Sequence, residues 1–207
     1  MNVPLTEQEK FWKGEFGAGY MERNTSFDLE NTRKAWKLML AKAQNVASAL
    51  ECGSNIGRNL DALKGAYPKT ELSLIEINEE AFRKVSEKIK PALSFNGPIA
   101  SSDFPSGRFD LTFTCGVLIH IAPESLEANL QKMFEYSKRY ILICEYFSRT
   151  PQELSYHGQA RKLFKCDFGK FFLQRFPVKT VDYGFLWAEE FESGGFDDMT
   201  WWLFEKK

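Results

Sequence analysis

The stretch Val46-Ala-Ser-Ala-Leu-Glu-Cys-Gly-Ser-Asn-Ile-Gly57 decides the fold of this chain. Small and apolar residues at 46–50 predict a short strand that ends at Glu51. Gly53 and Gly57 bracket a predicted tight turn, where glycine lets the backbone take positive φ and lets a ligand come close. Apolar residues then recur at helical spacing, namely Ile56, Leu60 and Leu63. The stretch therefore predicts a strand, a ligand-accessible turn and the start of a helix, with a purely structural turn as the alternative.

The spacing of the glycines bears on the kind of ligand. A dinucleotide fingerprint reads Gly-x-Gly-x-x-Gly, but here Asn55 stands where the second glycine belongs. This disfavours a pyrophosphate and leaves room for a nucleoside without phosphates. In open α/β sheets such ligands bind at the carboxyl ends of the strands, beside a topological switch point.

A second apolar run, residues 71–76, predicts another strand and ends in an acid, Glu76. It lies about 20–25 residues beyond the turn, the separation at which an acid meets ribose hydroxyls in nucleotide-binding α/β folds. A solvated acid at the end of a strand is the alternative.

Length and composition set the class of protein. The chain has 207 residues, 43% of them hydrophobic, and a net charge of −1. It therefore predicts one main domain at 45–207, preceded by a helical lead-in at 1–44. Its charge provides no general attraction to nucleic acid or to a membrane surface. Without a signal peptide or a run of about 18 apolar residues, we expect a cytoplasmic protein.

The cysteines and histidines do not predict a metal site. The four cysteines are scattered without a Cys-x-x-Cys pair, and neither of the two histidines lies at ligand spacing from a cysteine. Buried free thiols in a reducing compartment are expected. The sequence leaves open whether the protein is a monomer or a homodimer.

Strands and helices alternate along the rest of the chain. Helices are expected at 29–43, at 79–90, after residue 125 and after Asp167, and further strands at 97–103, 109–115, 140–147, 179–187 and 200–205. The stretch 148–164 is expected to be a polar, basic connection. This order predicts an α/β fold, a Rossmann-like, mostly parallel sheet of seven strands with helices on both faces and an antiparallel C-terminal strand.

The lead-in interleaves aromatic residues with glycines at 14, 17 and 19. The glycines argue against one long helix. A lid across a ligand is one interpretation, and an arm that packs its aromatic side chains on the domain is the other.

Three features in order make the chain resemble the class I S-adenosylmethionine-dependent methyltransferases. They are Glu51-x-Gly-x-x-x-Gly57, Glu76 after the second strand, and the segment from Phe109 to Ile121 around the fourth strand. More narrowly, three segments look like the pseudaminic acid biosynthesis-associated methylases: residues 11–24, Lys162-Leu-Phe-Lys-Cys-Asp-Phe168 and Asp197-Asp-Met-Thr-Trp-Trp202. Cys166 stands where that family would have a basic residue.

The resemblance implies S-adenosylmethionine as the cofactor, which carries no phosphates. Its methionine amine would meet Glu51 and backbone groups of Gly53 and Ser54, and its carboxylate would meet Tyr20 and Arg23. Gly57, which ends the turn, would also belong to the cofactor site. Glu76 would hold the ribose diol and Ile77 the adenine. The adenine amine would face Ser102 or Asp103. Thr114 and Cys115 would lie beneath the sulfonium.

The resemblance also implies methyl transfer to oxygen on a small anionic metabolite, a sugar acid of the nonulosonic type. His120 would be the base or the group that orients the acceptor, with Tyr20 beside it, or else a histidine that only begins a helix. Tyr156, Arg161 and Lys165 would bind the anion, or else lie on a solvent-facing loop.

Other functions stay open at this point. A phosphonate or carboxylate acceptor fits the same reaction, and a regulator could bind the cofactor without transferring its methyl group. Asn55 disfavours an NAD-dependent oxidoreductase. The near-zero charge and the lack of an Asn/Asp-Pro-Pro-Tyr/Trp motif disfavour nucleic-acid methylation.

Overall fold

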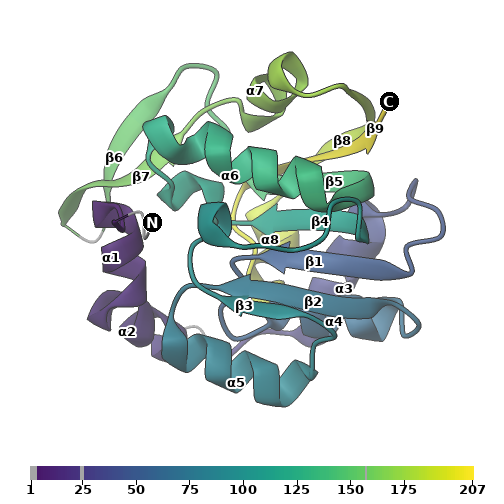
Figure 1. Cartoon of the computed structure of the whole chain (residues 1–207), viewed down its shortest axis with the longest axis horizontal. Coiled ribbons are helices and arrows are strands. Elements are labelled where there is room, and N and C mark those ends of the chain that lie inside the picture. Colours follow the sequence, from purple (N-terminus) through teal and green to yellow (C-terminus); the bar gives the residue numbers. More distant parts are fainter. Residues whose placement is uncertain (1–3, 24–25, 157) are drawn as a thin grey trace.

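The computed structural model describes residues 4–23, 26–156 and 158–207. Its described strands form a seven-stranded sheet in the order β3-β2-β1-β4-β5-β9-β8 and a separate hairpin, β6-β7 (Figure 1). The sheet contains β1 (Ser48–Cys52), β2 (Glu71–Glu76), β3 (Ser94–Asn96), β4 (Phe109–Cys115), β5 (Ser137–Glu145), β8 (Val178–Leu186) and β9 (Met199–Lys206).

Strand directions confirm the predicted sheet. β1 pairs in parallel with both β2 and β4, whereas β9 runs antiparallel to β5 and to β8. The strand order reverses between β1 and β4, which makes this the topological switch point. The glycine turn follows β1, and Glu76 is the last residue of β2. Both therefore lie at the carboxyl edge of the sheet, beside the switch point.

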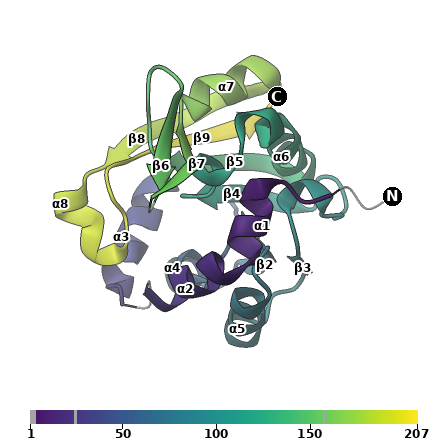
Figure 2. The same ribbon diagram turned by 90° about the vertical axis from the view of Figure 1, so that its left-hand side faces the viewer.

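Helices cover both faces of the sheet (Figure 2). One core layer holds Trp36, Leu63 and Val85, and the other holds Met133 and Phe172. The first layer is covered by α3 (Leu29–Met39), α4 (Arg58–Ala66) and α5 (Glu79–Ile89), and the second by α6 (Pro123–Tyr136) and α7 (Phe168–Arg175). The short α8 (Ala188–Phe191) precedes β9.

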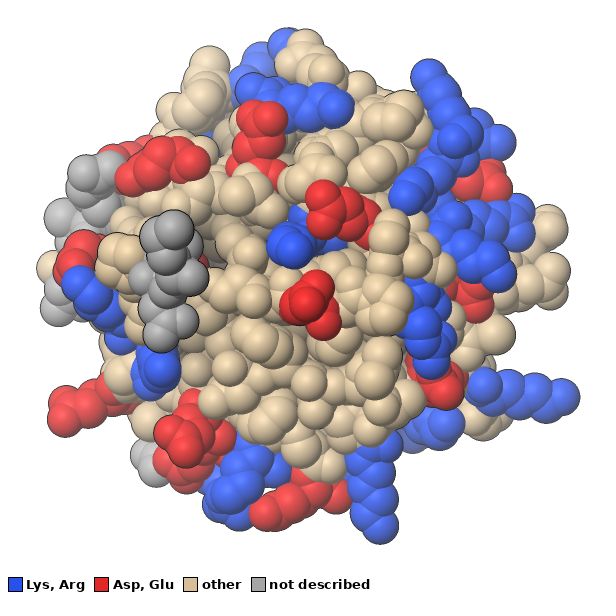
Figure 3. All heavy atoms as spheres, in the orientation of Figure 1, with Lys and Arg blue, Asp and Glu red and all other residues tan. Residues whose placement is uncertain are grey.

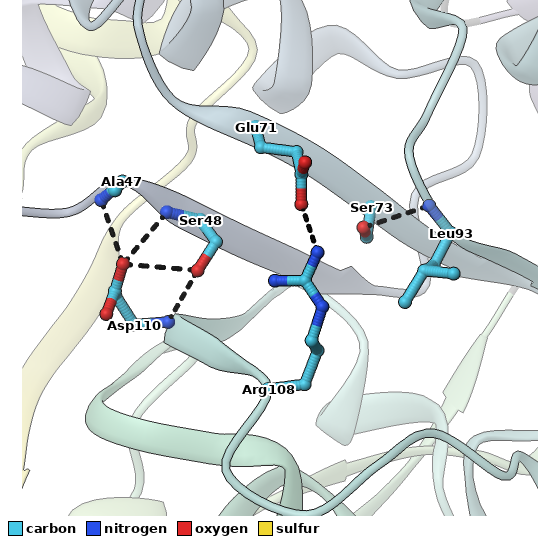
Figure 4. Close-up of polar contacts among 7 residues, drawn as sticks. All are labelled: Ala47, Ser48, Glu71, Ser73, Leu93, Arg108 and Asp110. Atoms are coloured by element: carbon cyan, nitrogen blue, oxygen red, sulfur yellow. Dashed lines mark hydrogen bonds and ion pairs between the residues drawn. The ribbon is translucent and has the colours of Figure 1, made fainter.

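The amino ends of the strands are held by a polar network opposite the glycine turn (Figure 4). One carboxylate oxygen of Asp110 accepts from the backbone N–H groups of Ala47 and Ser48 at 3.0 and 3.1 Å, and from the Ser48 hydroxyl at 3.1 Å. Glu71 and Arg108 form an ion pair between the starts of β2 and β4. These contacts fix the register of β1, β2 and β4.

Two segments differ from the sequence prediction. The third strand is Ser94–Asn96 rather than 97–103, because Pro98 has no N–H for the ladder and a 3₁₀ turn, Ile99–Ser101, follows it. The expected connection at 148–164 is instead a hairpin of β6 (Gln152–Tyr156) and β7 (Gln159–Lys165). Gly158, at φ 77°, supplies the left-handed residue of its turn.

The lead-in folds as two short helices, α1 (Glu7–Lys13) and α2 (Glu15–Arg23), which meet at Gly14. We call residues 4–23 the N-terminal cover, because they lie across the carboxyl edge of the sheet beside the hairpin (Figures 1 and 2). The helix 29–39 packs in the main core, with Trp36 fully buried. The division at residue 44 stays a prediction.

Charged side chains of both signs are interspersed around the rim of the face shown in Figure 3, and a few isolated acidic and basic side chains lie in its otherwise uncharged middle. Among the helices of the described residues, none has the length and apolar character needed to cross a membrane.

Candidate functional site

A cavity of about 200 Å³ lies at the carboxyl edge of β1, β2 and β4, beneath the N-terminal cover. Its described lining comprises Thr6, Gln8, Glu9, Trp12, Gly17, Tyr20, Gly53, Ser54, Asn55, Ile56, Arg58, Asn59, Ile75, Glu76, Ile77, Asn78, Gly97, Pro98, Ile99, Cys115, Gly116, Val117, His120, Ile121, Ala122, Ser125 and Asn129. The glycine turn and Glu76 therefore share one cavity, at the switch point.

The glycine turn has no room for a side chain. Gly53 has φ 85°, and a Cβ on it would come within 2.7 Å of Cγ2 of Val117. The N–H groups of Gly53 and Ser54 both donate to the Ile75 carbonyl, at 2.8 and 3.1 Å. The Ser54 hydroxyl is buried and has no hydrogen-bond partner among the described residues, which leaves it for a ligand.

Glu51, at the end of β1, is a buried acid with one unpaired oxygen. Its Oε1 accepts from Nδ2 of Asn59 at 2.8 Å, whereas its Oε2 has no partner among the described residues. Burial raises the pKa of this carboxyl well above its usual value. An ammonium group would supply the missing partner and favour the ionised form. Glu51 does not itself line the cavity, although Asn59 does.

Glu76 is held by backbone N–H groups on both sides. Its Oε2 accepts from Asn55 N at 2.6 Å and its Oε1 accepts from Asn78 N at 2.8 Å. Burial raises the pKa of Glu76, and these hydrogen bonds oppose that shift. Each oxygen keeps a further lone pair, so the carboxylate can still accept from two hydroxyls of a cis-diol.

Of the residues expected at the adenine, only Ile77 lines the cavity, where Pro98 and Ile99 join it. Ser102 does not, because its hydroxyl donates to the Ile99 carbonyl at 2.6 Å, on the core side of the 3₁₀ turn. Asp103 is exposed and lies outside the lining.

Two further predicted cofactor residues do not line the cavity. A Cβ on Gly57 would come within 2.6 Å of Val85, so this glycine permits close packing of the turn on α5. Thr114 is fully buried in β4 and lies outside the lining, whereas Cys115, which was also predicted, and Gly116 line the cavity.

The N-terminal cover forms the roof. Trp12 and Tyr20 line the cavity, and their rings meet edge to face at 5.3 Å. Nδ2 of Asn78 donates to the carbonyl oxygens of Trp12 and Lys13 at 3.3 and 3.2 Å. Asn78 therefore connects the roof to the backbone beside Glu76. The side chain of Arg23 lies outside the described part of the chain.

His120 also lines the cavity, and its ring lies 4.5 Å from that of Trp12 and 4.9 Å from that of Tyr156. Its Nδ1 lies 2.9 Å from the Lys162 carbonyl on the hairpin. Burial lowers the pKa of His120 to about 4. The ring is therefore neutral at pH 7, with the proton assigned to Nδ1 because a carbonyl only accepts, and with the lone pair on Nε2.

Two of the predicted anion-binding residues, Tyr156 and Lys165, lie outside the described lining of the cavity. The Lys165 ammonium is 4.8 Å from the centre of the Tyr146 ring, and Tyr146 donates a hydrogen bond to Asp197. Tyr20 and Tyr156 are close enough to Tyr146 to contribute to its raised pKa. The side chain of Arg161 lies outside the described part.

Arg58 was not predicted, yet it alone is basic among the described lining residues. It donates to the Gly195 carbonyl, and its guanidinium lies 4.9 Å from the centre of the Phe196 ring. The sequence offered one signal for it, its place directly after the second glycine. Asn55 and Asn78 were also missed as site residues, although both flank predicted motifs. Among the described residues, no group of three or more His, Cys, Asp and Glu could hold a metal ion.

No protein-family model and no curated protein matches the chain. Solved structures do match it. The 1,6-didemethyltoxoflavin-N1-methyltransferase of Burkholderia thailandensis, with bound 1,6-didemethyltoxoflavin and S-adenosylhomocysteine, is 17% identical, and the match covers 100% of this chain and 93% of that one with a TM-score of 0.73. Magnesium protoporphyrin IX methyltransferase of Synechocystis PCC 6803, with bound S-adenosylmethionine, is 12% identical over 100% of both chains, with a TM-score of 0.67.

N-methyltransferase NodS of Bradyrhizobium japonicum WM9 is 15% identical, covering 90% of this chain and 97% of that one, with a TM-score of 0.60. At such identities the likeness establishes the fold. The chain has the fold of the class I S-adenosylmethionine-dependent methyltransferases.

Proposed function

We propose that the chain binds S-adenosylmethionine in this cavity and transfers its methyl group to a small molecule bound beside His120. The observation that carries the proposal is the pair of buried carboxylates at the ends of β1 and β2, one with an unpaired oxygen and one with free lone pairs. Glu51 can accept from an amine at its unpaired oxygen, and Glu76 can accept further hydrogen bonds from a cis-diol; the cofactor provides both groups. Two of the matching structures hold it or its demethylated product.

Residues of this chain would hold the cofactor as follows. Glu51 and the Ser54 hydroxyl receive the methionine amine, and Glu76 receives the ribose hydroxyls. Ile77 packs against the adenine. Arg58, in the lining near β1, is the cation available to the methionine carboxylate, together with Tyr20.

Bound there, S-adenosylmethionine supplies a methyl group activated by a sulfonium. Such a transfer is an in-line displacement, so its rate depends on holding the acceptor atom in line with the methyl carbon and the sulfur. His120 accepts a hydrogen bond from the acceptor at Nε2 and so orients it. Because its pKa is about 4, it is a weak base, and orientation is its main contribution.

For the acceptor we propose oxygen of a sugar acid, as implied by the resemblance to the pseudaminic acid biosynthesis-associated methylases. Gln8, Ser125 and Asn129 give the lining polar groups that suit a molecule with several hydroxyls. Lys165 is the nearby cation for its carboxylate, with Tyr156 beside His120. A phosphonate or another carboxylate would use the same groups. A cytoplasmic location and a monomeric or homodimeric state stay predictions.

The experiment measures S-adenosylhomocysteine binding by calorimetry in wild type, Glu76→Ala and Glu71→Ala. Loss of the charged partner of the ribose hydroxyls should weaken binding about 10- to 100-fold. Glu71 begins the same strand and pairs with Arg108 away from the cavity (Figure 4), so Glu71→Ala should bind as wild type does. Absence of binding to wild type, or tighter binding of NADH, refutes the proposal.

A radiolabelled-methyl assay then tests the acceptor. A sugar acid should be methylated faster than the same sugar with its carboxylate converted to an amide. Cofactor binding without transfer to any sugar acid, phosphonate or carboxylate would favour the regulator. Equal methylation rates for the sugar acid and its amide would refute the proposal that the acceptor is an anion.

A further inference from the structure

Glu145, at the carboxyl end of β5, is a fully buried acid that lies outside the cavity lining. Its Oε1 accepts from the backbone N–H groups of Val117 and Leu118, each at 3.0 Å. Its Oε2 accepts from Ile119 N at 3.4 Å. One carboxylate thus binds three consecutive N–H groups of the segment that follows β4.

This segment touches both halves of the proposed site. At one end, the side chain of Val117 packs against Gly53 so closely that a Cβ there would collide with it. At the other end, the 3₁₀ turn Leu118–His120 presents the imidazole of His120 to the cavity. A shift of the segment would therefore disturb the glycine turn and His120 together.

The three N–H groups require an acceptor of this kind. Gly116, at φ 67°, turns the chain out of the sheet after its N–H donates to the Cys144 carbonyl at 2.9 Å. The next three N–H groups donate to Glu145 instead of to a neighbouring strand, and a buried donor without a partner is destabilising. An ionised carboxylate offers lone pairs on both oxygens, whereas a glutamine offers one acceptor oxygen and places an amide donor where the other was.

We propose that Glu145 is a positioning residue of the methyl-transfer site, whose ionised carboxylate fixes residues 117–120 against the glycine turn and holds His120 at the acceptor end. This inference rests on the proposed function. Glu145 would act only through the segment, because backbone N–H groups of the segment engage both of its carboxylate oxygens.

The inference predicts a pH dependence. Burial raises the pKa of Glu145 to about 7, and the three N–H groups oppose that rise. Above this pH the ionised acid accepts all three hydrogen bonds, and below it a proton occupies one acceptor position. The ionisable groups around it are the thiols of Cys115, Cys144 and Cys166, and the guanidinium of Arg58 interacts with the first two of these thiols.

Proton NMR of His120 gives a readout that needs no acceptor. The chain has two histidines, so His157→Asn leaves the imidazole signal of His120 alone. His120, with a pKa of about 4, stays neutral between pH 5.5 and 9. Its signal should nevertheless shift with a midpoint near pH 7 as Glu145 titrates, and this shift should vanish in Glu145→Gln. Cys115→Ser should keep it, which separates Glu145 from the nearest thiol in the cavity.

A flat signal in the His157→Asn background, or a shift that survives Glu145→Gln, overturns the inference. Should Glu145→Gln fail to fold, ¹³C labelling of the glutamate carboxyl carbons in the otherwise unaltered protein replaces it. One carboxyl signal should then titrate with the midpoint of the His120 signal, and different midpoints would overturn the inference.

Binding of S-adenosylhomocysteine separates the inference from the proposed function. At pH 8, Glu145→Gln should bind about tenfold more weakly than wild type, and at pH 5.5 the two should be alike. Equal affinity at pH 8 overturns the inference alone. Failure of the wild type to bind S-adenosylhomocysteine would refute the proposed function. The NMR result alone would then decide whether Glu145 positions residues 117–120.

Discussion

Replacement of His120 by asparagine should make the stability of the protein less dependent on pH. Burial holds the pKa of the folded imidazole at about 4, against 6.5 for an ordinary histidine. As the pH falls through 6.5, His120 binds a proton in the unfolded chain but stays neutral in the folded chain. The stabilising contribution is thus complete above about pH 6.5 and is lost progressively down to pH 4.

The size of the effect follows from the shift. One pKa unit corresponds to about 1.4 kcal/mol, so the whole shift is worth about 3.5 kcal/mol, of which about 2.5 kcal/mol is lost between pH 7.5 and pH 4.5. Asparagine is the suitable replacement because its amide can still donate to the Lys162 carbonyl while carrying no titrating group. Glu145 titrates in both proteins, so its contribution to the pH dependence of the free energy of unfolding cancels in the comparison.

Urea unfolding at pH 7.5 and 4.5 measures the effect. On acidification, wild type should lose about 2.5 kcal/mol more of its free energy of unfolding than His120→Asn does. His157→Asn, measured in parallel, separates the contribution of the second histidine. Equal losses in wild type and His120→Asn would show that His120 is not held neutral by burial, and the role given to its Nε2 lone pair would fall with it.

Two further predictions test the cofactor end of the cavity. Gly53→Ala places a Cβ within 2.7 Å of Val117 at a residue with positive φ. It should lower the free energy of unfolding by about 1–3 kcal/mol and abolish S-adenosylhomocysteine binding. The control is Gly107→Ala, which also has positive φ but has nothing within 4 Å of its Cβ, and it should keep binding. Arg58→Ala should weaken S-adenosylhomocysteine about tenfold and leave adenosine, which has no carboxylate, unaffected. Calorimetry checks both, and equal losses for the two ligands would refute the role of Arg58.

Much of the architecture follows from local pattern. Strands 48–52 and 109–115 are rich in apolar residues and are buried along almost their whole length, as strands covered on both faces are. The glycine turn and Glu76 could be predicted as neighbours, because parallel strands deliver the residues after them to the same edge. The fold and the place of the site were therefore accessible from the sequence.

Side-chain partners were not accessible in this way. Ser102 and Asp103 were expected at the adenine, but a 3₁₀ turn after Pro98 sends the Ser102 hydroxyl into the core. The sequence predicts a connection at 148–164, where the structure has the hairpin β6-β7. Each of these two strands is stabilised by pairing with the other, and its own sequence pattern does not indicate a strand.

By itself, the sequence determined the order of the elements, the sheet and the edge at which a ligand would bind, because these depend on apolar periodicity and on glycine. Only the tertiary structure decided that His120 is neutral and that Glu145 binds residues 117–119. Those properties depend on burial and on contacts across 42 and 26–28 positions of the chain. No local pattern carries such information, since the desolvation and the hydrogen bonds that set them exist only once the chain has folded.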